Sequence, residues 1–477
     1  MHETRFGALI IASLMSLLLL AGSGGADDSS VTGADDVNAS AGLLSPLSSL
    51  EDPVDRMLET QFENGLRVLT LEDHATPVVS FQMWVRVGSR DESRYTGLAH
   101  LFEHMMFKGS DNIPPEKHAQ LINARGGRIN AFTSRDFTVY LADVTSETLP
   151  LVIELEAERV ANLDISQETL DSERQVVLEE RRMRTEDRPM GRALEALMAL
   201  TYTAHPYRWP VIGWRSDVEK ATVEACREFF DAYYVSNNMV IAIAGDFETG
   251  PTLDVIRRTF GKLPRATRIP RNPTVEPVQT GERRAIVHFD LRAPVLAAAW
   301  PAPASGHVDG EALDILSTIL SAGRSSRLYR RLVYDEEQAL DAEGGFWEML
   351  ESGVFYAFAT ARPGVSVDRI ERLFMEEIER LQREPIGQDE LDKAKRQMEV
   401  GLVNGLATSH ALASRIGREV STFGRVRPLA ERLASIQAVT VEDVQRVART
   451  YLQKDKRSVV HVIAAPPGFA EQNGAGR

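Results

Sequence analysis

The chain contains an internal repeat on the two sides of a proline-rich segment, and this repeat limits the folds that it can adopt. In the first half, Thr222-Val-Glu opens a predicted helix that ends near Tyr233 and is followed by the apolar run VIAIAG. In the second half, Thr440-Val-Glu opens a helix that ends near Tyr451 and is followed by VVHVIA. Both pairs of anchors are 218 residues apart (440 − 222 and 451 − 233). The shared order and spacing predict a duplicated domain; a chance likeness of two threonine-capped helices is the alternative.

Strands and helices alternate in the first half without a strict βαβ order. Apolar residues at every second position of 79–87 predict a half-buried strand. Residues 137–144 form a second strand candidate, and Gly126-Gly127 marks a turn into a third. Helical stretches are predicted at 97–108 and 166–183. We therefore expect α+β sandwich domains.

The boundaries of the domains follow from composition. Four prolines fall between Leu263 and Thr280 among few large apolar residues, which predicts an extended linker over 263–283. The linker separates a first domain, 51–262, from a second domain, 284–467, and residues 468–477 form a tail.

The N-terminus resembles a secretory signal. Arg5 precedes an apolar run from Ala8 to Ala21, and small residues follow as far as Ala26. This pattern predicts a signal peptide over 1–26, followed by a disordered tether over 27–50. A retained membrane anchor is the alternative, but the run is shorter than the ~20 residues of a spanning helix. We expect a periplasmic or secreted protein with no stable membrane span after cleavage.

Charge and cysteine content exclude two kinds of site. The formal net charge is −15 and the pI is near 5.3. Because nucleic-acid phosphates need basic patches, we expect no nucleic-acid partner. Cys226 is the single cysteine of the sequence, so a metal site must use nitrogen and oxygen ligands.

The motif His100-Leu-Phe-Glu103-His104 lies in the predicted helix 97–108, for which Thr96 is a plausible N-cap. At about 100° per residue, both histidines and Glu103 share one helix face. Histidines four residues apart can bind one metal ion together. Glu103 lies beside them, where it can take a proton from a metal-bound water. A polar face exposed to solvent is the alternative.

A third ligand must come from elsewhere, because a catalytic zinc takes three protein ligands and keeps one position for water. The best candidate is Glu180 in the predicted helix 166–183. Glu173 lies seven residues earlier on the same face, with Val176 and Val177 between them, which indicates a buried face. Glu179 is expected to point to solvent. Ion pairing of these carboxylates with neighbouring arginines is the alternative.

These residues together predict one zinc ion per chain, bound by His100, His104 and Glu180. Zinc makes hydroxide available near neutral pH and polarises a scissile carbonyl. Glu103 is then the general base.

The chain resembles the pitrilysin/insulinase family of inverted-motif zinc peptidases over roughly residues 55–465. The similarity is strongest to the half-length branch that includes mitochondrial processing peptidase and its bacterial relatives. It rests on the helix His100–Gly109 and on the gap of 76 residues from His104 to Glu180 (180 − 104). The resemblance implies two homologous α/β-sandwich domains, each a mostly antiparallel sheet packed with helices. It also implies that Glu173 is a further acidic residue of the catalytic site.

The resemblance implies a place for the substrate as well. Residues 126–133 correspond to an edge strand that binds an extended peptide by strand addition, with Asn130, Ala131, Phe132 and Thr133 as the substrate-binding residues. The helix near 309–322 of the second half offers no zinc ligands, so that half is expected to be a supporting domain.

The expected partners are peptide substrates and a second chain. Family members enclose peptides between four such domains, which here requires a homodimer or a heterodimer with a related non-catalytic subunit. The family places an arginine and a tyrosine in the second half, whereas the strand 353–360 presents Phe355, Tyr356 and Phe358. We expect a zinc metalloendopeptidase that hydrolyses unfolded peptides or small proteins. The alternative is a non-catalytic or partner-dependent subunit that binds or supports another chain.

Overall fold

The computed structural model describes residues 51–466 and contains two sheets. The first has the order β1-β2-β6-β3-β5-β4 and the second the order β7-β11-β8-β10-β9. Their strands are β1 (Leu58–Gln61), β2 (Arg67–Glu72), β3 (Val78–Val85), β4 (Arg128–Thr133), β5 (Thr138–Thr145) and β6 (Met239–Gly245), then β7 (Arg283–Phe289), β8 (Val295–Ala302), β9 (Ala339–Trp347), β10 (Gly353–Ala361) and β11 (Ser458–Ala464). The predicted signal peptide, tether and tail all lie outside the described residues.

Apart from β1, which has no counterpart in the second sheet, the two sheets have the same topology. β2 runs parallel to β6, as β7 does to β11, and every other neighbouring pair is antiparallel. The Thr222 and Thr440 side chains each accept a backbone N–H at the start of the helix that precedes β6 or β11. The predicted fold class, two homologous α+β domains with mostly antiparallel sheets, is confirmed. Residues 264–282, within the predicted linker, contain no helix or strand.

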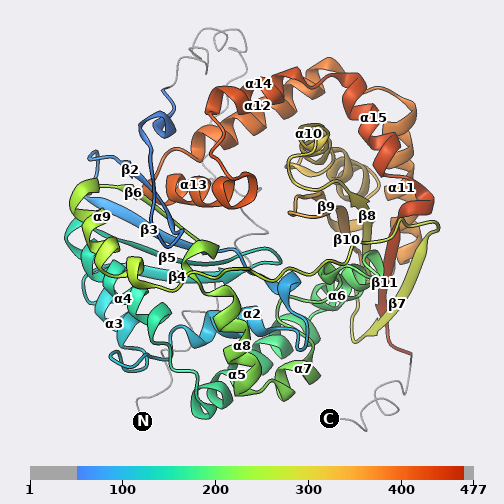
Figure 1. The fold of residues 1–477 in the computed structure, drawn as a ribbon. Helices are drawn as coiled ribbons and strands as arrows, with labels where there is room; N and C mark the ends of the chain where they lie inside the picture. The colour runs from blue at the N-terminus through green and yellow to red at the C-terminus, as the bar shows by residue number, and fades with distance from the viewer. Residues whose placement is uncertain (1–50, 467–477) are drawn as a thin grey trace.

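Helices cover both sheets (Figure 1). Those of the first half are α2 (Leu98–Met105), α3 (Lys117–Asn123), α4 (Leu149–Ala161), α5 (Gln167–Arg181), α6 (Pro189–Thr201), α7 (Arg215–Lys220), α8 (Val223–Tyr233) and α9 (Thr249–Arg258). Those of the second half are α10 (Gly310–Ser321), α11 (Val367–Arg383), α12 (Gln388–Asn404), α13 (Ser409–Phe423), α14 (Leu429–Ala438) and α15 (Val441–Tyr451). No helix among the residues that the structure describes has the length and apolar character needed to cross a membrane.

The two halves exchange one helix each. α6 of the first half packs on the second sheet, where Leu197 and Met198 meet Ala297 and Val460. α13 of the second half packs on the first sheet, where Ile416 joins a cluster with Leu69 and other strand residues. Figure 1 shows α13 on the face of the first sheet opposite to α3 and α4. Each sheet therefore has one face covered by helices of its own half and the other face covered by a helix of the other half.

This exchange corrects the expectation of a half-buried strand at 79–87. β3 is buried on both faces, and Val78 alone among its eight residues is exposed. The polar positions are satisfied by α13, because Gln82 Nε2 donates to Ser414 Oγ at 2.9 Å. Trp84 Nε1 in turn donates to Gln82 Oε1 at 3.2 Å. The alternation seen in the sequence marks a polar inter-half contact and not a solvent face.

A polar junction also joins the halves, and its residues in the first half are buried, whereas Glu351 is exposed. Arg90 Nη1 lies 3.2 Å from Asp136 Oδ1 and 2.9 Å from Glu351 Oε1 of the second half. Tyr207 donates to Asp136 Oδ1 at 2.6 Å, and His205 Nε2 lies 2.8 Å from Glu351 Oε2. Since charges buried at an interface must be paired, these contacts fix how the two halves meet.

The fit of α13 against the first sheet can be tested at Gly417. A Cβ added there would lie 2.0 Å from Trp84 Nε1, whose side chain is buried. We expect Gly417→Ala to lower the free energy of unfolding by about 1–3 kcal/mol through overpacking. Gly401 in α12 is the matched control, because a Cβ there meets nothing within 4 Å. Gly401→Ala should raise stability by about 0.5–1 kcal/mol. Urea unfolding measures the free energy of unfolding of both variants. Equal changes in the two variants would contradict the close contact between Gly417 and Trp84.

Candidate metal centre

Three donor side chains converge between α2 and α5. His100 and His104 lie one turn apart on α2, and Glu180 lies in the last turn of α5. His100 Nε2 is 3.8 Å from Glu180 Oε1, and His104 Nε2 is 3.2 Å from Glu180 Oε2. One ligand atom from each of the three residues lies within 4.8 Å of the other two. The three ligands predicted from the sequence are thus brought together.

The start of α2 is held differently from the prediction. Gly97, with φ 91°, is the N-cap, and the helix ends at Met105, before Lys108. Thr96 Oγ1 instead donates to Asp217 Oδ2 at 2.8 Å. The buried carboxylate of Glu92 accepts the N–H groups of Gly97 and Ala99, both at 2.8 Å. These N–H groups have no partner within the helix, so Glu92 replaces the expected threonine cap by accepting them.

Glu103 lies on the donor face of α2 and is oriented by the edge strand β4. Thr133 Oγ1 donates to Glu103 Oε2 at 2.7 Å. Glu103 is buried, and burial raises the pKa of its carboxyl, while the charge of His104 and the hydrogen bond from Thr133 lower it. The Thr133 hydroxyl therefore fixes the carboxylate and favours its ionised form.

Glu173 contacts the outer side of His104 and is not one of the three clustered donors. Its Oε2 lies 3.5 Å from His104 Nδ1, and its Oε1 lies 3.2 Å from Lys108 Nζ. A carboxylate on the second nitrogen of a histidine fixes the ring and leaves the first nitrogen for a metal. The placement favours a positioning role for Glu173 over the catalytic role predicted for it.

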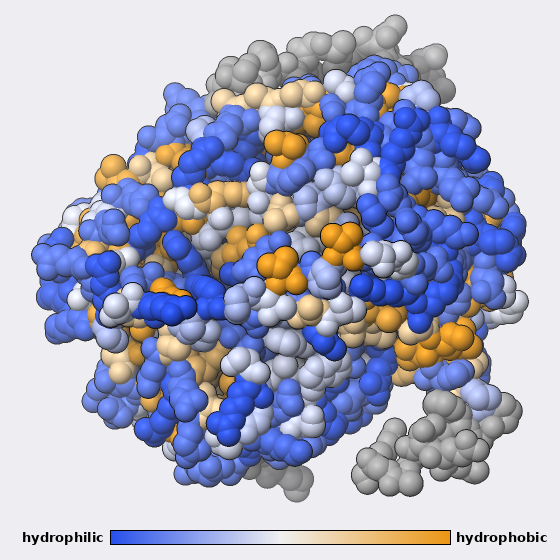
Figure 2. Space-filling view, turned by 45° about the vertical axis from the view of Figure 1, so that its right-hand side comes forward, coloured by the Kyte–Doolittle hydropathy of each residue, from blue (hydrophilic) through white to orange (hydrophobic). Residues whose placement is uncertain are grey.

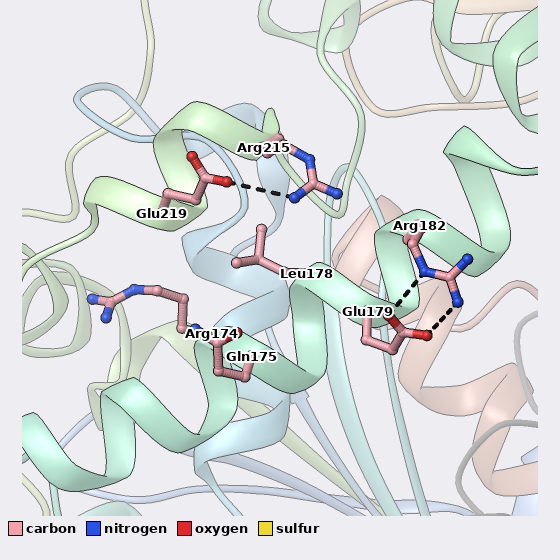
Figure 3. Close-up of a pocket in the computed structure, with 7 residues that line it drawn as sticks. All are labelled: Arg174, Gln175, Leu178, Glu179, Arg182, Arg215 and Glu219. Atoms are coloured by element: carbon pink, nitrogen blue, oxygen red, sulfur yellow. Dashed lines mark hydrogen bonds and ion pairs between the residues drawn. The ribbon is translucent and has the colours of Figure 1, made fainter. Parts of the chain in front are cut away.

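The valines near Glu173 are divided between two faces of α5. Val177 is buried, as expected, but Val176 is 46% exposed and does not belong to the buried face. Glu179 is exposed and pairs with Arg182 on the outer face, with Glu179 Oε1 and Arg182 Nη2 2.6 Å apart (Figure 3). The pocket drawn in Figure 3 lies on this outer side of α5, where Arg215 and Glu219 also pair.

The predicted substrate-binding residues lie on β4, at one edge of the first sheet. β4 pairs only with β5 among the described strands, with Asn130 opposite Leu141 and Thr133 opposite Thr138. Ala131 and Thr133 are buried toward α2, whereas Asn130 and Phe132 are half-buried. The edge of β4 thus passes directly beside Glu103, where an added strand would bring a peptide to the donors.

Comparison with known proteins shows the family of the chain. Residues 67–213 match the family described as insulinase (peptidase family M16), and residues 220–398 match the peptidase M16 inactive domain. An uncharacterized zinc protease of Mycobacterium tuberculosis is 33% identical over 421 residues, which are 86% of this chain and 94% of that protein. The chain belongs to the peptidase M16 family.

Two further relatives extend the comparison. The crystal structure of a protease from Helicobacter pylori is similar to this M16 chain with a TM-score of 0.83 and 29% identity, over 85% of this chain and 99% of that one. A probable mitochondrial-processing peptidase subunit beta of Arabidopsis thaliana is 27% identical over 87% of this chain and 79% of that protein. The predicted family resemblance is confirmed.

The donor set of this M16 chain fits zinc. Burial lowers the pKa of His100 to about 4, so its imidazole is neutral and offers a lone pair. Burial also disfavours a charge on His104, but the carboxylates of Glu173 and Glu180 outweigh it and raise its pKa to about 9. Burial acts against ionisation of Glu180, yet contacts with His104 and His100 lower its pKa to about 2. Two imidazoles and a carboxylate are a ligand set of catalytic zinc sites.

A second group of potential ligands does not fit a metal. Asp368, Glu371 and His461 approach one another in the second half. However, Glu371 binds Arg457 Nη2 at 2.7 Å and Arg284 Nη1 at 2.9 Å. Because two guanidinium groups already neutralise this carboxylate, a divalent cation would be repelled.

The second half contributes no comparable helix. α10 occupies the place of α2 after β8, and it contains Glu311 and Asp314 but no histidine. Phe355 and Phe358 of β10 are buried in the packing of the second sheet, and Tyr356 packs against Trp347. Phe355 and Phe358 thus belong to the packing of the second domain, and Tyr356 is half-buried beside them.

Two residues near the donors were missed from the sequence. Glu92 acts across the loop that precedes α2, and no local pattern connects it to Ala99. The other is Arg184, whose Nη1 lies 2.5 Å from Glu180 Oε1. The spacing of four residues between Glu180 and Arg184 is that of helical ion pairs and could have indicated this contact.

The capping role of Glu92 can be tested by its removal. Glu92→Ala leaves the N–H groups of Gly97 and Ala99 buried without a partner, which should lower the free energy of unfolding by about 1–3 kcal/mol. Glu179→Ala on the exposed face of α5 is the control and should change stability by no more than about 0.5 kcal/mol. Urea unfolding measures both. Equal stability of the two variants would show that the cap is dispensable.

Proposed function

We propose that the chain is a zinc metalloendopeptidase that hydrolyses unfolded peptides or small proteins. The observation that carries this proposal is the convergence of His100, His104 and Glu180 beside the buried carboxylate of Glu103. Relatives named zinc proteases support the same class of reaction. Zinc bound by these three residues would lower the pKa of a bound water and polarise the scissile carbonyl.

The protein groups then have distinct tasks. Glu103 takes a proton from the attacking water and delivers it to the leaving amine. Thr133 holds that carboxylate by its hydrogen bond of 2.7 Å. Glu173 orients His104 from its outer side. The free edge of β4 binds the substrate as an added strand, so backbone hydrogen bonds give affinity with little demand on the peptide sequence.

The partner and the location complete the proposal. The chain works as a homodimer or as a heterodimer with a related subunit, which is supported by the relative named as a subunit of mitochondrial processing peptidase. Export to the periplasm or medium rests on the sequence of residues 1–26 alone. The alternative is a partner-dependent or non-catalytic subunit, and α10 of the second half, which contains no histidine, offers no second metal site in its favour or against it.

Hydrolysis of a quenched fluorescent peptide library by the full mature chain tests the function. We expect cleavage that stops on removal of zinc by a chelator and returns with added zinc. Glu103→Gln should lower kcat by at least about 100-fold, because general base catalysis contributes on this order. The same variant should still bind zinc.

Glu179→Gln is the matched control, since this carboxylate faces solvent on the same helix as Glu180. It should cleave like the wild type. Cleavage that persists in Glu103→Gln would refute the mechanism. A chain that binds zinc but cleaves nothing, alone or with a related subunit, would favour the non-catalytic alternative.

The pH dependence of cleavage should report on Thr133. Glu103 must be ionised to act as a base, and burial raises its pKa while Thr133 lowers it. Activity is therefore lost as the pH falls through the pKa of Glu103. Thr133→Val removes the lowering hydrogen bond, so the acidic limb of the kcat/KM profile should move to higher pH. Thr133→Ser keeps a hydroxyl and should leave the limb near its wild-type position; an equal shift in both variants would contradict this role.

A further inference from the structure

A guanidinium group lies directly against the donor cluster. Arg184 Nη1 is 2.5 Å from Glu180 Oε1, and that same oxygen is 3.8 Å from His100 Nε2. The side chain of Arg184 is 28% exposed, whereas that of Glu180 is 13% exposed. Arg184 therefore stands at the boundary between the buried donors and the solvent, from which a substrate must approach.

The backbone around Arg184 is unusual. α5 continues after Arg181 as a π-helix, η7 (Arg182–Glu186). Short π-helical turns in proteins are frequent at functional sites, because they change the direction in which side chains leave the helix. Within η7, Arg182 pairs with Glu179 on the outer face, while Arg184 turns to Glu180. Both arginines thus pair with a glutamate of α5, but Arg184 does so at the donor cluster and Arg182 on the outer face.

The electrostatic surroundings favour a cation at this point. Burial lowers the pKa of His100 and raises that of Glu103, and the charge of Arg184 adds a smaller lowering effect on both, so it is felt across the donor cluster. Lys108, another cation beside the cluster, pairs with Glu173 and Glu116 behind His104. Arg184 is accordingly the cation on the side of His100 and Glu180.

We propose that Arg184 is a catalytic residue that contacts the carbonyl oxygen of the scissile peptide bond; this inference rests on the proposed function. As the water oxygen bonds to the carbonyl carbon, the π electron pair of the carbonyl moves onto its oxygen. The guanidinium stabilises that negative charge, and it can hold the Glu180 carboxylate and a second oxygen together because its donors form a planar fork. When the C–N bond breaks, the pair returns to the carbonyl, and the leaving nitrogen takes the proton that Glu103 removed.

Three variants of the full chain, loaded with zinc, test this role. Arg184→Gln should lower kcat by about 100-fold or more, as loss of a charge-stabilising donor does. Its KM for a quenched peptide should change by only a few fold. Arg184→Lys keeps the charge without the fork and should retain part of the rate. Arg182→Gln is the matched control from the same π-helix and should behave like the wild type.

Two measurements without turnover separate catalysis from metal binding. Zinc affinity, measured by competition with a chromogenic chelator, should be nearly unchanged in Arg184→Gln. Affinity for a phosphinic peptide, which carries a tetrahedral anion in place of the scissile bond, should fall in parallel with kcat/KM.

Each other outcome is decisive. If Arg184→Gln keeps the wild-type kcat and phosphinic affinity, the proposal is wrong. It is also wrong if the lost activity returns at saturating zinc, because Arg184 would then act only on the ligand Glu180. If the wild type itself neither cleaves peptides nor binds the phosphinic peptide, the proposed function fails, and the role of Arg184 fails with it.

Discussion

The reciprocal exchange of α6 and α13 is the contact on which the rest of the structure depends. The helix that carries Glu180, α5, continues as η7, and only two residues separate η7 from α6, which is packed against the second sheet. One of the three donors is therefore anchored to the half of the chain that has no donors of its own. The two histidines are anchored through α2 to the first sheet. The donor site lies where α2, held by the first sheet, contacts α5, whose end is held by the second sheet through α6.

Burial gives the site its electrostatic character. Three carboxylates, those of Glu103, Glu173 and Glu180, gather around two imidazoles in a largely buried region. Burial opposes a charge on His104, but the carboxylates of Glu173 and Glu180 on its two sides favour the ring that carries an extra proton and raise its pKa to about 9. Metal binding must release that proton, so zinc affinity and pH are linked in this arrangement.

The sequence predicted the features that local rules govern. His100, Glu103 and His104 share a face because helical spacing dictates it, and Glu180 was found because a carboxylate on a buried helix needs a cation. The duplicated topology followed from one repeated spacing. Even the edge strand β4 followed from the turn at Gly126-Gly127 together with the family resemblance.

Contacts between distant segments were not predictable in the same way. β3 alternates like a half-buried strand, and only the arrival of α13, more than 300 residues later, makes its polar face internal. Thr96 is a residue type suited to an N-cap, but its hydroxyl donates to the distant Asp217. Glu92 accepts the N–H groups at the start of the helix instead. In both cases a polar side chain forms its hydrogen bond with a distant segment, and not with solvent or with the nearby helix start as the local sequence suggests.

The second half, although it lacks donors, has a physical reason to persist beside the site. Without α13, the strand face bearing Gln82 and Trp84 would be exposed, and burial of both faces of β3 would be lost. Without its sheet, α6 would have no apolar surface for Leu197 and Met198, and η7 would lose its anchor. The position of Glu180 relative to His100 and His104 would then depend on α5 alone. A domain without ligands can thus determine the geometry of a metal site, because it fixes the helix from which one ligand comes.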